Sequence, residues 1–205
     1  MRFLCCRSKQ ERRASVEFGA LTSTGRLSVD DLQGFISQHA ELWAMLGVNL
    51  GIDDKRCQEI ATDVAFEMAC GDSAGEETWV RNRHGFTRVM TEEQFVKFRT
   101  TVVDDPKGQQ LFFHKTVFAA FDGDKNGYLD ASELEQFLGI FYEAGSIFKG
   151  DSRLPPKEEL LALVRERLDV DRDGRLTFDE IHSLISGSAA QALTSSGAVT
   201  VLRSA

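Results

Sequence analysis

The sequence predicts an all-α protein in which four similar units follow one another along 205 residues. Three observations support this fold class. A short loop followed by an amphipathic helix recurs four times, each of these helices begins with residues that can cap its first turn, and 42% of the residues are hydrophobic, which is enough to build a core. No apolar run approaches the length that a helix needs to cross a bilayer.

The four units share the same apolar spacing. Each has an apolar residue at the eighth place of its loop and two more, three residues apart, in the helix that follows. That interval of three puts both helical residues on one face. The eighth places hold Leu27, Met90, Leu129 and Leu176, and the helical pairs are Leu32 with Phe35, Phe95 with Phe98, Leu134 with Phe137, and Ile181 with Leu184. The repeat therefore predicts four amphipathic helices.

The same four helices share a start signal. A residue that can cap the helix is followed three residues later by Asp, Gln or Glu, which can return a hydrogen bond to the capping residue. These pairs are Ser28 with Asp31, Thr91 with Gln94, Asp130 with Glu133, and Thr177 with Glu180. Further helices are expected at 57–68, 113–121 and 160–168, and the polar residues 71–82 are expected to form a surface insertion.

Charge and composition divide the chain into four segments. Residues 1–13 contain five basic residues and Glu11, a charge of +4, which leaves −12 for the rest of a chain whose formal net charge is −8. This basic arm is followed by helical segments at 14–103 and 104–187, and by a tail at 188–205 rich in Ser, Ala and Gly, which is predicted to be flexible. An acidic body with a basic arm argues against nucleic acid as a partner.

Two acidic loops of twelve residues lie in the segment 104–187. Both follow the pattern D-x-[DN]-x-[DN]-G-x5-E in full. Calcium takes roughly six to eight oxygen ligands, and this spacing supplies side chains at places one, three, five, nine and twelve and a main-chain carbonyl at place seven. We number the loops of the four units in chain order, so these two are loop three (122–133) and loop four (169–180). The predicted ligands are Asp122, Asp124, Asn126, Tyr128 (carbonyl), Asp130 and Glu133 in loop three, and Asp169, Asp171, Asp173, Arg175 (carbonyl), Thr177 and Glu180 in loop four.

Each loop also has glycine at its sixth place, Gly127 and Gly174, where the turn needs a conformation that glycine adopts easily. The alternative explanation for one such loop is a solvated acidic turn. Two matches in tandem, each between apolar helical stripes, favour metal sites over that alternative. The sequence therefore predicts two calcium ions in the C-terminal half.

These loops resemble the EF-hand family of calcium-binding proteins, and the resemblance covers about residues 111–187. It implies that loops three and four pair through a short antiparallel β-ribbon in which Leu129 faces Leu176. It also implies that 104–187 is a calcium-binding EF-hand pair.

The first half of the chain resembles the same family in outline. Loop one, 20–31, has Ala20, Thr22 and Thr24 where carboxylates belong, and loop two, 83–94, begins with arginine and ends with glutamine. So little negative charge makes calcium binding there unfavourable, so we interpret 14–103 as a degenerate EF-hand pair. This layout resembles that of calcineurin-B-like and neuronal calcium sensor proteins.

The resemblance implies a calcium sensor that exposes an apolar surface to a target protein or amphipathic helix. The alternative is a calcium buffer without a dedicated partner. After Met90 the chain contains no methionine, and many of its apolar residues are phenylalanine. A binding surface made of phenylalanine is predicted to be stiffer and more selective than one made of methionine. An enzyme is not predicted. Residues 71–75 match the hydrolase pattern G-x-S-x-G, but that motif needs a preceding strand, and a helical stripe precedes it here.

The four cysteines have no spacing typical of a disulfide framework or a zinc site, so a cytoplasmic protein is expected. Cys57 and Cys70 are interpreted as buried small hydrophobes. Cys5 and Cys6 lie among the basic residues of the arm, which predicts S-acylation and contact with an anionic membrane. The alternative is an unmodified arm.

Overall fold

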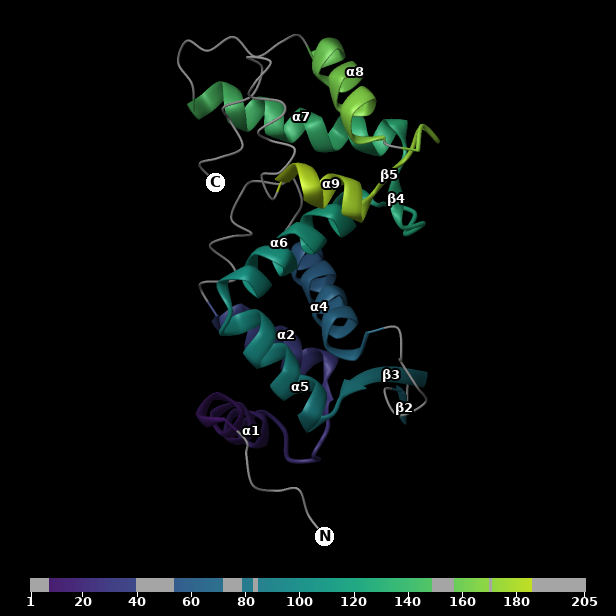
Figure 1. Cartoon of the computed structure of the whole chain (residues 1–205). Helices are drawn as coiled ribbons and strands as arrows, with labels where there is room; N and C mark the ends of the chain where they lie inside the picture. The colour runs from purple at the N-terminus through teal and green to yellow at the C-terminus, as the bar shows by residue number, and fades with distance from the viewer. Residues whose placement is uncertain are drawn as a thin grey trace. The chain divides into compact units, whose positions relative to one another are not determined.

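The computed structural model describes residues 8–39, 54–71, 79–82, 85–148, 157–169 and 171–185. It is mostly helical, with short strands paired in two small sheets, which confirms the all-α fold class (Figure 1). Contacts divide the chain into two units, and the division falls within one continuous helix, after Thr116. The sequence placed the boundary at 104, before that helix begins.

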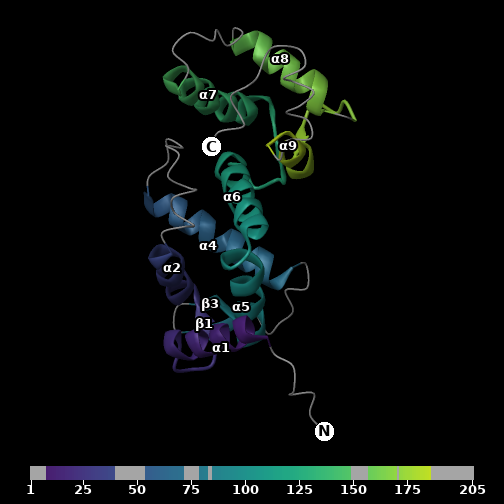
Figure 2. The same cartoon turned by 60° about the vertical axis from the view of Figure 1, so that its left-hand side comes forward.

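The first unit starts with α1 (Lys9–Leu21), which begins inside the segment predicted to be an arm. Ser8 caps this helix, since its Oγ accepts a hydrogen bond from Glu11 N at 3.1 Å and the Glu11 carboxylate accepts one from Ser8 N. Ala14 and Phe18, four residues apart, are buried. The helix packs against α5 (Glu92–Phe98), where the Phe18 ring lies 5.7 Å from that of Phe95 (Figure 2).

Two further helices complete the core of this unit, α2 (Val29–Gln38) and α4 (Asp54–Cys70). Reciprocal capping bonds between Ser28 and Asp31 begin α2, and bonds between Thr91 and Gln94 begin α5, which confirms both predicted capping pairs. The predicted helix 57–68 lies within α4. Cys57 and Cys70 on that helix are half-buried, so the prediction that they are buried was wrong.

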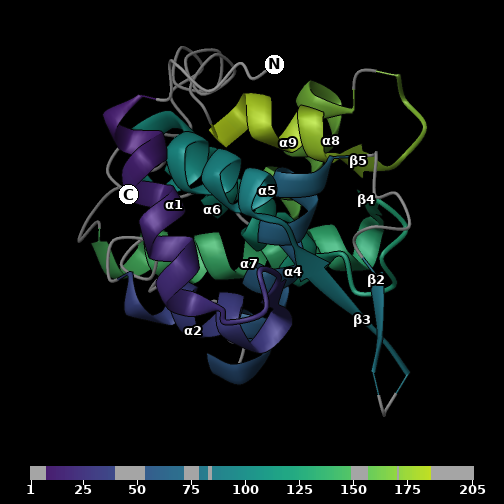
Figure 3. The same ribbon diagram turned by 90° about the horizontal axis from the view of Figure 1, so that it is seen from below.

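A three-stranded sheet in the order β1-β3-β2 joins the two loops of this unit. Its strands are β1 (Leu27–Ser28), β2 (Trp79–Asn82) and β3 (Gly85–Met90), all antiparallel to their neighbours, with Leu27 opposite Met90. Figure 3 shows β2 and β3 side by side as a hairpin.

The hairpin corrects two expectations. The end of 71–82 forms a strand, which the sequence did not predict, and β3 occupies part of the place expected for loop two; aromatic and β-branched residues favour this extended structure. Residues 72–78, 83 and 84, which include most of the G-x-S-x-G match and the start of loop two, lie outside the described residues.

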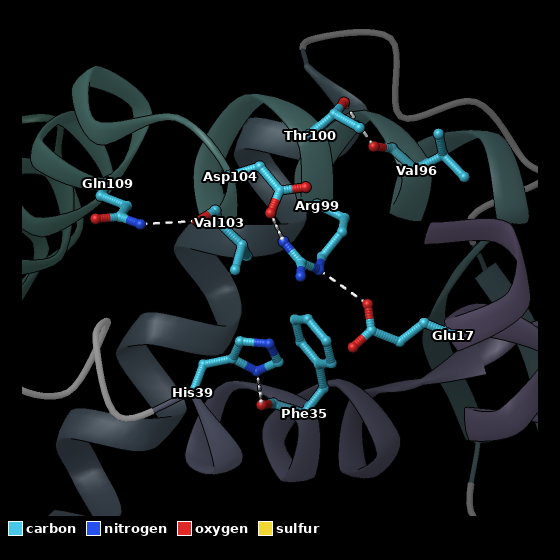
Figure 4. Close-up of polar contacts among 9 residues, drawn as sticks. All are labelled: Glu17, Phe35, His39, Val96, Arg99, Thr100, Val103, Asp104 and Gln109. Atoms are coloured by element: carbon cyan, nitrogen blue, oxygen red, sulfur yellow. Dashed lines mark hydrogen bonds and ion pairs between the residues drawn. The ribbon is translucent and has the colours of Figure 1, made fainter. Parts of the chain in front are cut away.

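A π-helical turn, η2 (Arg99–Val103), links α5 to α6 (Pro106–Phe121). Arg99 in this turn is only 5% exposed, and Figure 4 shows its guanidinium between Glu17 of α1 and Asp104. Arg99 Nε donates to Glu17 Oε2 at 2.8 Å, and Nη1 donates to Asp104. Burial by itself lowers the pKa of Arg99, but these two carboxylates outweigh that effect and raise it.

Close packing also fixes α6 against the π-helical turn η2. A Cβ built on Gly108 would lie 1.7 Å from the main-chain oxygen of Thr101, so only glycine fits where α6 crosses the π-helical turn. The side chain of Gln109 donates to Val103 O at 2.7 Å and satisfies one of the carbonyls that the turn leaves open (Figure 4).

The second unit contains β4 (Tyr128–Leu129), α7 (Ala131–Phe148), α8 (Lys157–Leu168), β5 (Leu176–Thr177) and α9 (Phe178–Ile185). Strands β4 and β5 pair antiparallel with Leu129 opposite Leu176, which confirms the expected ribbon. The tail 188–205 lies outside the described residues. Within the ranges given above, no helix combines the length and apolar character needed to span a membrane.

Candidate metal centre

Loops three and four share a backbone signature. Lys125 and Arg172, at the fourth place, have φ of 58° and 60°, and Gly127 and Gly174, at the sixth, have φ of 86° and 80°. A left-handed conformation is uncommon for a residue other than glycine. Loop one differs, because Gly25 has φ of 71° at its sixth place but its fourth residue is not left-handed. The two acidic loops therefore fold alike and unlike loop one.

Main-chain amides orient the carboxylates of loop three. Asp122, which is 8% exposed, accepts a hydrogen bond from Asn126 N on Oδ1 and one from Gly127 N on Oδ2, both at 3.0 Å. Asp124 Oδ1 also accepts from Asn126 N, at 3.1 Å, and Asn126 Oδ1 accepts from Tyr128 N at 3.0 Å. Since a carboxylate oxygen has two lone pairs, these bonds fix the side chains and leave each oxygen able to bind a cation.

The glutamate at the twelfth place returns to the start of loop three. Glu133 Oε1 accepts a hydrogen bond from Gly123 N at 2.8 Å, and Oε2 accepts one from Asp130 N at 3.1 Å. Asp130 Oδ1 in turn accepts from Glu133 N at 3.0 Å, which confirms the predicted capping pair at the start of α7. The first turn of α7 therefore contains Glu133, which is both a member of the capping pair and the last predicted ligand of loop three.

The spacing of three carboxylates in loop three fits one calcium ion. One ligand oxygen from each of Asp122, Asp124 and Glu133 lies within 4.8 Å of the others. Oxygens bound at about 2.3–2.6 Å from one calcium ion are at most about 5 Å apart. The three oxygens are therefore close enough to one another to bind the same ion.

Loop four repeats most of this arrangement. Asp169 accepts from Asp173 N on Oδ1 at 3.0 Å and from Gly174 N on Oδ2 at 2.9 Å, as Asp122 does in loop three. Here the group within 4.8 Å consists of Asp169, Asp171 and Asp173. Glu180 Oε2 accepts from Thr177 N at 2.9 Å and from its Oγ1 at 2.8 Å, which confirms the capping pair at the start of α9.

Two carboxylates of the loops have shifted pKa values. The main-chain amide of Glu133, together with the amide and hydroxyl of Ser132, lowers the pKa of Asp130. In loop four the amide of Asp173 lowers the pKa of Asp171. Desolvation and the neighbouring acidic side chains outweigh that effect, so the pKa is raised. Repulsion between carboxylates in loop four is what a bound cation relieves.

The two residues at the seventh places, predicted as carbonyl ligands, also touch through their side chains. The guanidinium carbon of Arg175 lies 4.3 Å from the centre of the Tyr128 ring, across the β4–β5 ribbon. This cation–π contact was not predicted from the sequence. An arginine and a tyrosine at the same place of two paired loops are the signal from which it could have been found.

Loop one satisfies its polar groups without a cation. Thr22 Oγ1 donates to Arg26 O at 2.7 Å, Thr24 Oγ1 donates to the same carbonyl at 3.1 Å, and the two hydroxyls lie 3.0 Å apart. These oxygens stand at the third, fifth and seventh places, which are ligand places in a calcium loop. Their mutual hydrogen bonds agree with the interpretation of loop one as a hand without metal.

Comparisons with known proteins agree with this geometry. The family model of the EF-hand domain pair matches residues 113–186, which include both acidic loops. Human guanylyl cyclase-activating protein 3 is 29% identical over 104 residues, a region that makes up 50% of this chain and 44% of that protein.

Among solved structures, the apoaequorin complex with (S)-HM-daCTZ aligns over 88% of this chain and 84% of its own, with 14% identity and a TM-score of 0.31. The loop geometry and the family match lead to the same assignment. Residues 113–186 form an EF-hand domain pair, and the chain is similar to guanylyl cyclase-activating protein 3 over about half of its own length and less than half of that protein's.

Proposed function

We propose that the protein is a calcium sensor that binds one calcium ion in loop three and one in loop four, and then presents an apolar surface to a target protein. The observation that supports this role is an aromatic contact across loop three. Phe121 precedes the first predicted ligand, Phe137 lies one turn after the last one, and their rings are 5.4 Å apart.

The loop links calcium to that contact. Without a cation the carboxylates repel one another, and Glu133 is held by main-chain amides. Calcium neutralises the group and draws the glutamate toward Asp122. Because Glu133 lies in the first turn of α7, its movement shifts α7, and with it Phe137, relative to Phe121 at the end of α6.

A second aromatic contact links α6 to loop four in the same way. The Phe118 ring lies 5.6 Å from that of Phe178, the first residue of α9, which directly follows the ribbon. Phe118, Phe121 and Phe137 are at most 9% exposed. Opening either hand therefore converts buried aromatic surface into a site for an amphipathic helix or another apolar segment of a partner.

The kind of target is a separate proposal. The human relative is named for activating guanylyl cyclase, and the match spans less than half of that relative. For this chain we propose a non-catalytic role toward a protein target, reached through the phenylalanine surface of the second unit. A phenylalanine surface repacks less readily than a methionine surface, so we expect a narrow range of targets.

A dye that fluoresces on apolar surface tests the sensor role. Its signal should rise when calcium is added to the full-length protein, fall again with chelator, and respond far less to magnesium. Glu133→Gln, which weakens the grip of loop three, should reduce the rise, whereas Glu159→Gln on the exposed side of α8 should not. Full calcium binding with an unchanged dye signal would favour the buffer instead.

The cysteines of the basic arm support a second proposal, that of a cytoplasmic protein held at a membrane. Cys5 and Cys6 lie beside Arg2 and Arg7, outside the described residues. An acyl group passed from an acyl-CoA to either thiol forms a thioester and releases coenzyme A. Stable anchoring requires two signals, and two acyl chains, or one chain with the basic arm, supply them.

A further inference from the structure

The outward side of α1 carries three basic residues and one apolar residue. Lys9, Arg12, Arg13 and Val16 recur at helical spacing and lie on one side of the helix, opposite the buried Phe18. All four are exposed. Val16, two turns after Lys9 and flanked by the two arginines, is 75% exposed, and among the described residues it is the one large hydrophobic side chain classed as exposed.

The acidic residues of α1 are engaged elsewhere. Glu11 accepts the hydrogen bond from Ser8 N that completes the capping box. Glu17 accepts from Arg99 Nε at 2.8 Å and so faces the core of its unit. Within the described ranges, none of the three basic side chains of α1 forms an ion pair. Their charges therefore remain in solvent around an exposed apolar centre.

We propose that this side of α1 docks the protein on an anionic lipid surface, with the three cations at the phosphates and Val16 at the boundary of the acyl chains. A helix that lies in the membrane interface places basic residues on either side of its apolar residues, and here Arg12 and Arg13 lie on either side of Val16. A single valine on a convex helix suits a lipid surface better than a pocket in a protein, because lipids adapt to its shape.

Charge favours the same orientation. The chain has a formal net charge of −8, and all of its acidic residues except Glu11 lie beyond the arm, which has a charge of +4. An anionic membrane repels most of such a chain and attracts α1, so the protein approaches with this face first. This docking is independent of the calcium sites and of the sensor role. It deepens the membrane proposal made above for the basic arm by placing the contact on one face of α1, and because the test uses unacylated protein, its failure would not decide whether Cys5 and Cys6 are acylated.

The test is sedimentation with lipid vesicles, using full-length protein whose cysteines are shown by intact mass to be unmodified. The protein should bind phosphatidylcholine vesicles that contain phosphatidylserine, release them as salt is raised, and bind pure phosphatidylcholine vesicles far less. Each basic residue near such a surface strengthens binding roughly fivefold, so Arg12→Gln with Arg13→Gln should weaken partitioning about 30-fold. Val16→Ser should weaken it about tenfold, because it removes a buried valine.

A matched control separates this face from net charge. Lys55→Gln with Lys107→Gln removes the same charge from exposed sites on α4 and α6 and should leave partitioning within about twofold of the parent. None of these variants should change calcium binding, so failure here is distinct from failure of the sensor proposal. The proposal is overturned if the parent does not bind anionic vesicles, if it binds neutral ones equally, or if the control variant loses as much as the arginine variant.

Discussion

The contact between Arg175 and Tyr128 predicts an energetic link between the two calcium loops. Each residue holds the seventh place of its loop, so each main chain is a predicted calcium ligand while the side chains stack across the ribbon at 4.3 Å. Filling one loop orders its seventh residue and so helps to order the other. Arg175→Met or Tyr128→Leu should therefore weaken the cooperativity of calcium binding.

The size of the expected loss of cooperativity follows from the solvent exposure of the Arg175–Tyr128 contact. Arg175 is exposed, and a cation–π contact at an exposed site contributes about 0.5–1 kcal/mol. If the contact forms fully only when both loops are filled, that energy is the coupling free energy. It corresponds to a factor of about 2–5 in the affinity of the second ion.

Calorimetric titration of the two single variants and the double variant measures this coupling as a double-mutant cycle. Arg172→Met is the matched control, because it removes the same charge from loop four at a place without the stacking contact, and it should leave cooperativity unchanged. Tyr128→Phe keeps the aromatic face and should behave as the parent. Strictly additive effects of Arg175→Met and Tyr128→Leu would refute the link.

Three further predictions concern packing, protons and lipid. Gly108→Ala should lower the free energy of unfolding, measured in urea, by about 3 kcal/mol because its Cβ overlaps a main-chain oxygen of the π-helical turn. Gly19→Ala, with open space around its Cβ, should not lower the free energy of unfolding. Because the pKa of Asp171 is raised, protons compete with calcium there first, so titrations at falling pH should show loop four losing affinity before loop three. The double variant Cys5→Ser, Cys6→Ser should move from the membrane pellet to the soluble fraction of cells; a parent already fully soluble contradicts acylation.

Local patterns predicted the helix starts and the grouping of acidic side chains in loops three and four. The capping pair of Ser28 and Asp31 and the carboxylate group around Asp122 each depend on residues within one short segment, so their spacing in the sequence is their spacing in the fold. The ribbon between Leu129 and Leu176 was expected from the family resemblance, because pairing of two separate loops is not visible in either loop alone.

Features that depend on distant residues were missed. Arginine is usually a surface residue, so burial of Arg99 was not expected. It is buried because Glu17, 82 residues earlier in the chain, supplies the opposite charge. The hairpin of β2 and β3 was missed because its polar residues resemble a loop, and the two strands are stabilised by each other and by β1. Such partners are defined by the fold and not by local spacing.

We expect calcium to bind at two places, loops three and four, and nowhere else in the chain. Titration calorimetry of the full-length protein, with Glu133→Gln and Glu180→Gln singly and together, tests it most directly. Each change removes the charge of a glutamate at the twelfth place, the predicted bidentate ligand. The parent should bind two ions, each single variant should bind one ion with high affinity, and the double variant should bind none with high affinity. A high-affinity ion retained by the double variant, or a third ion in the parent, would contradict it.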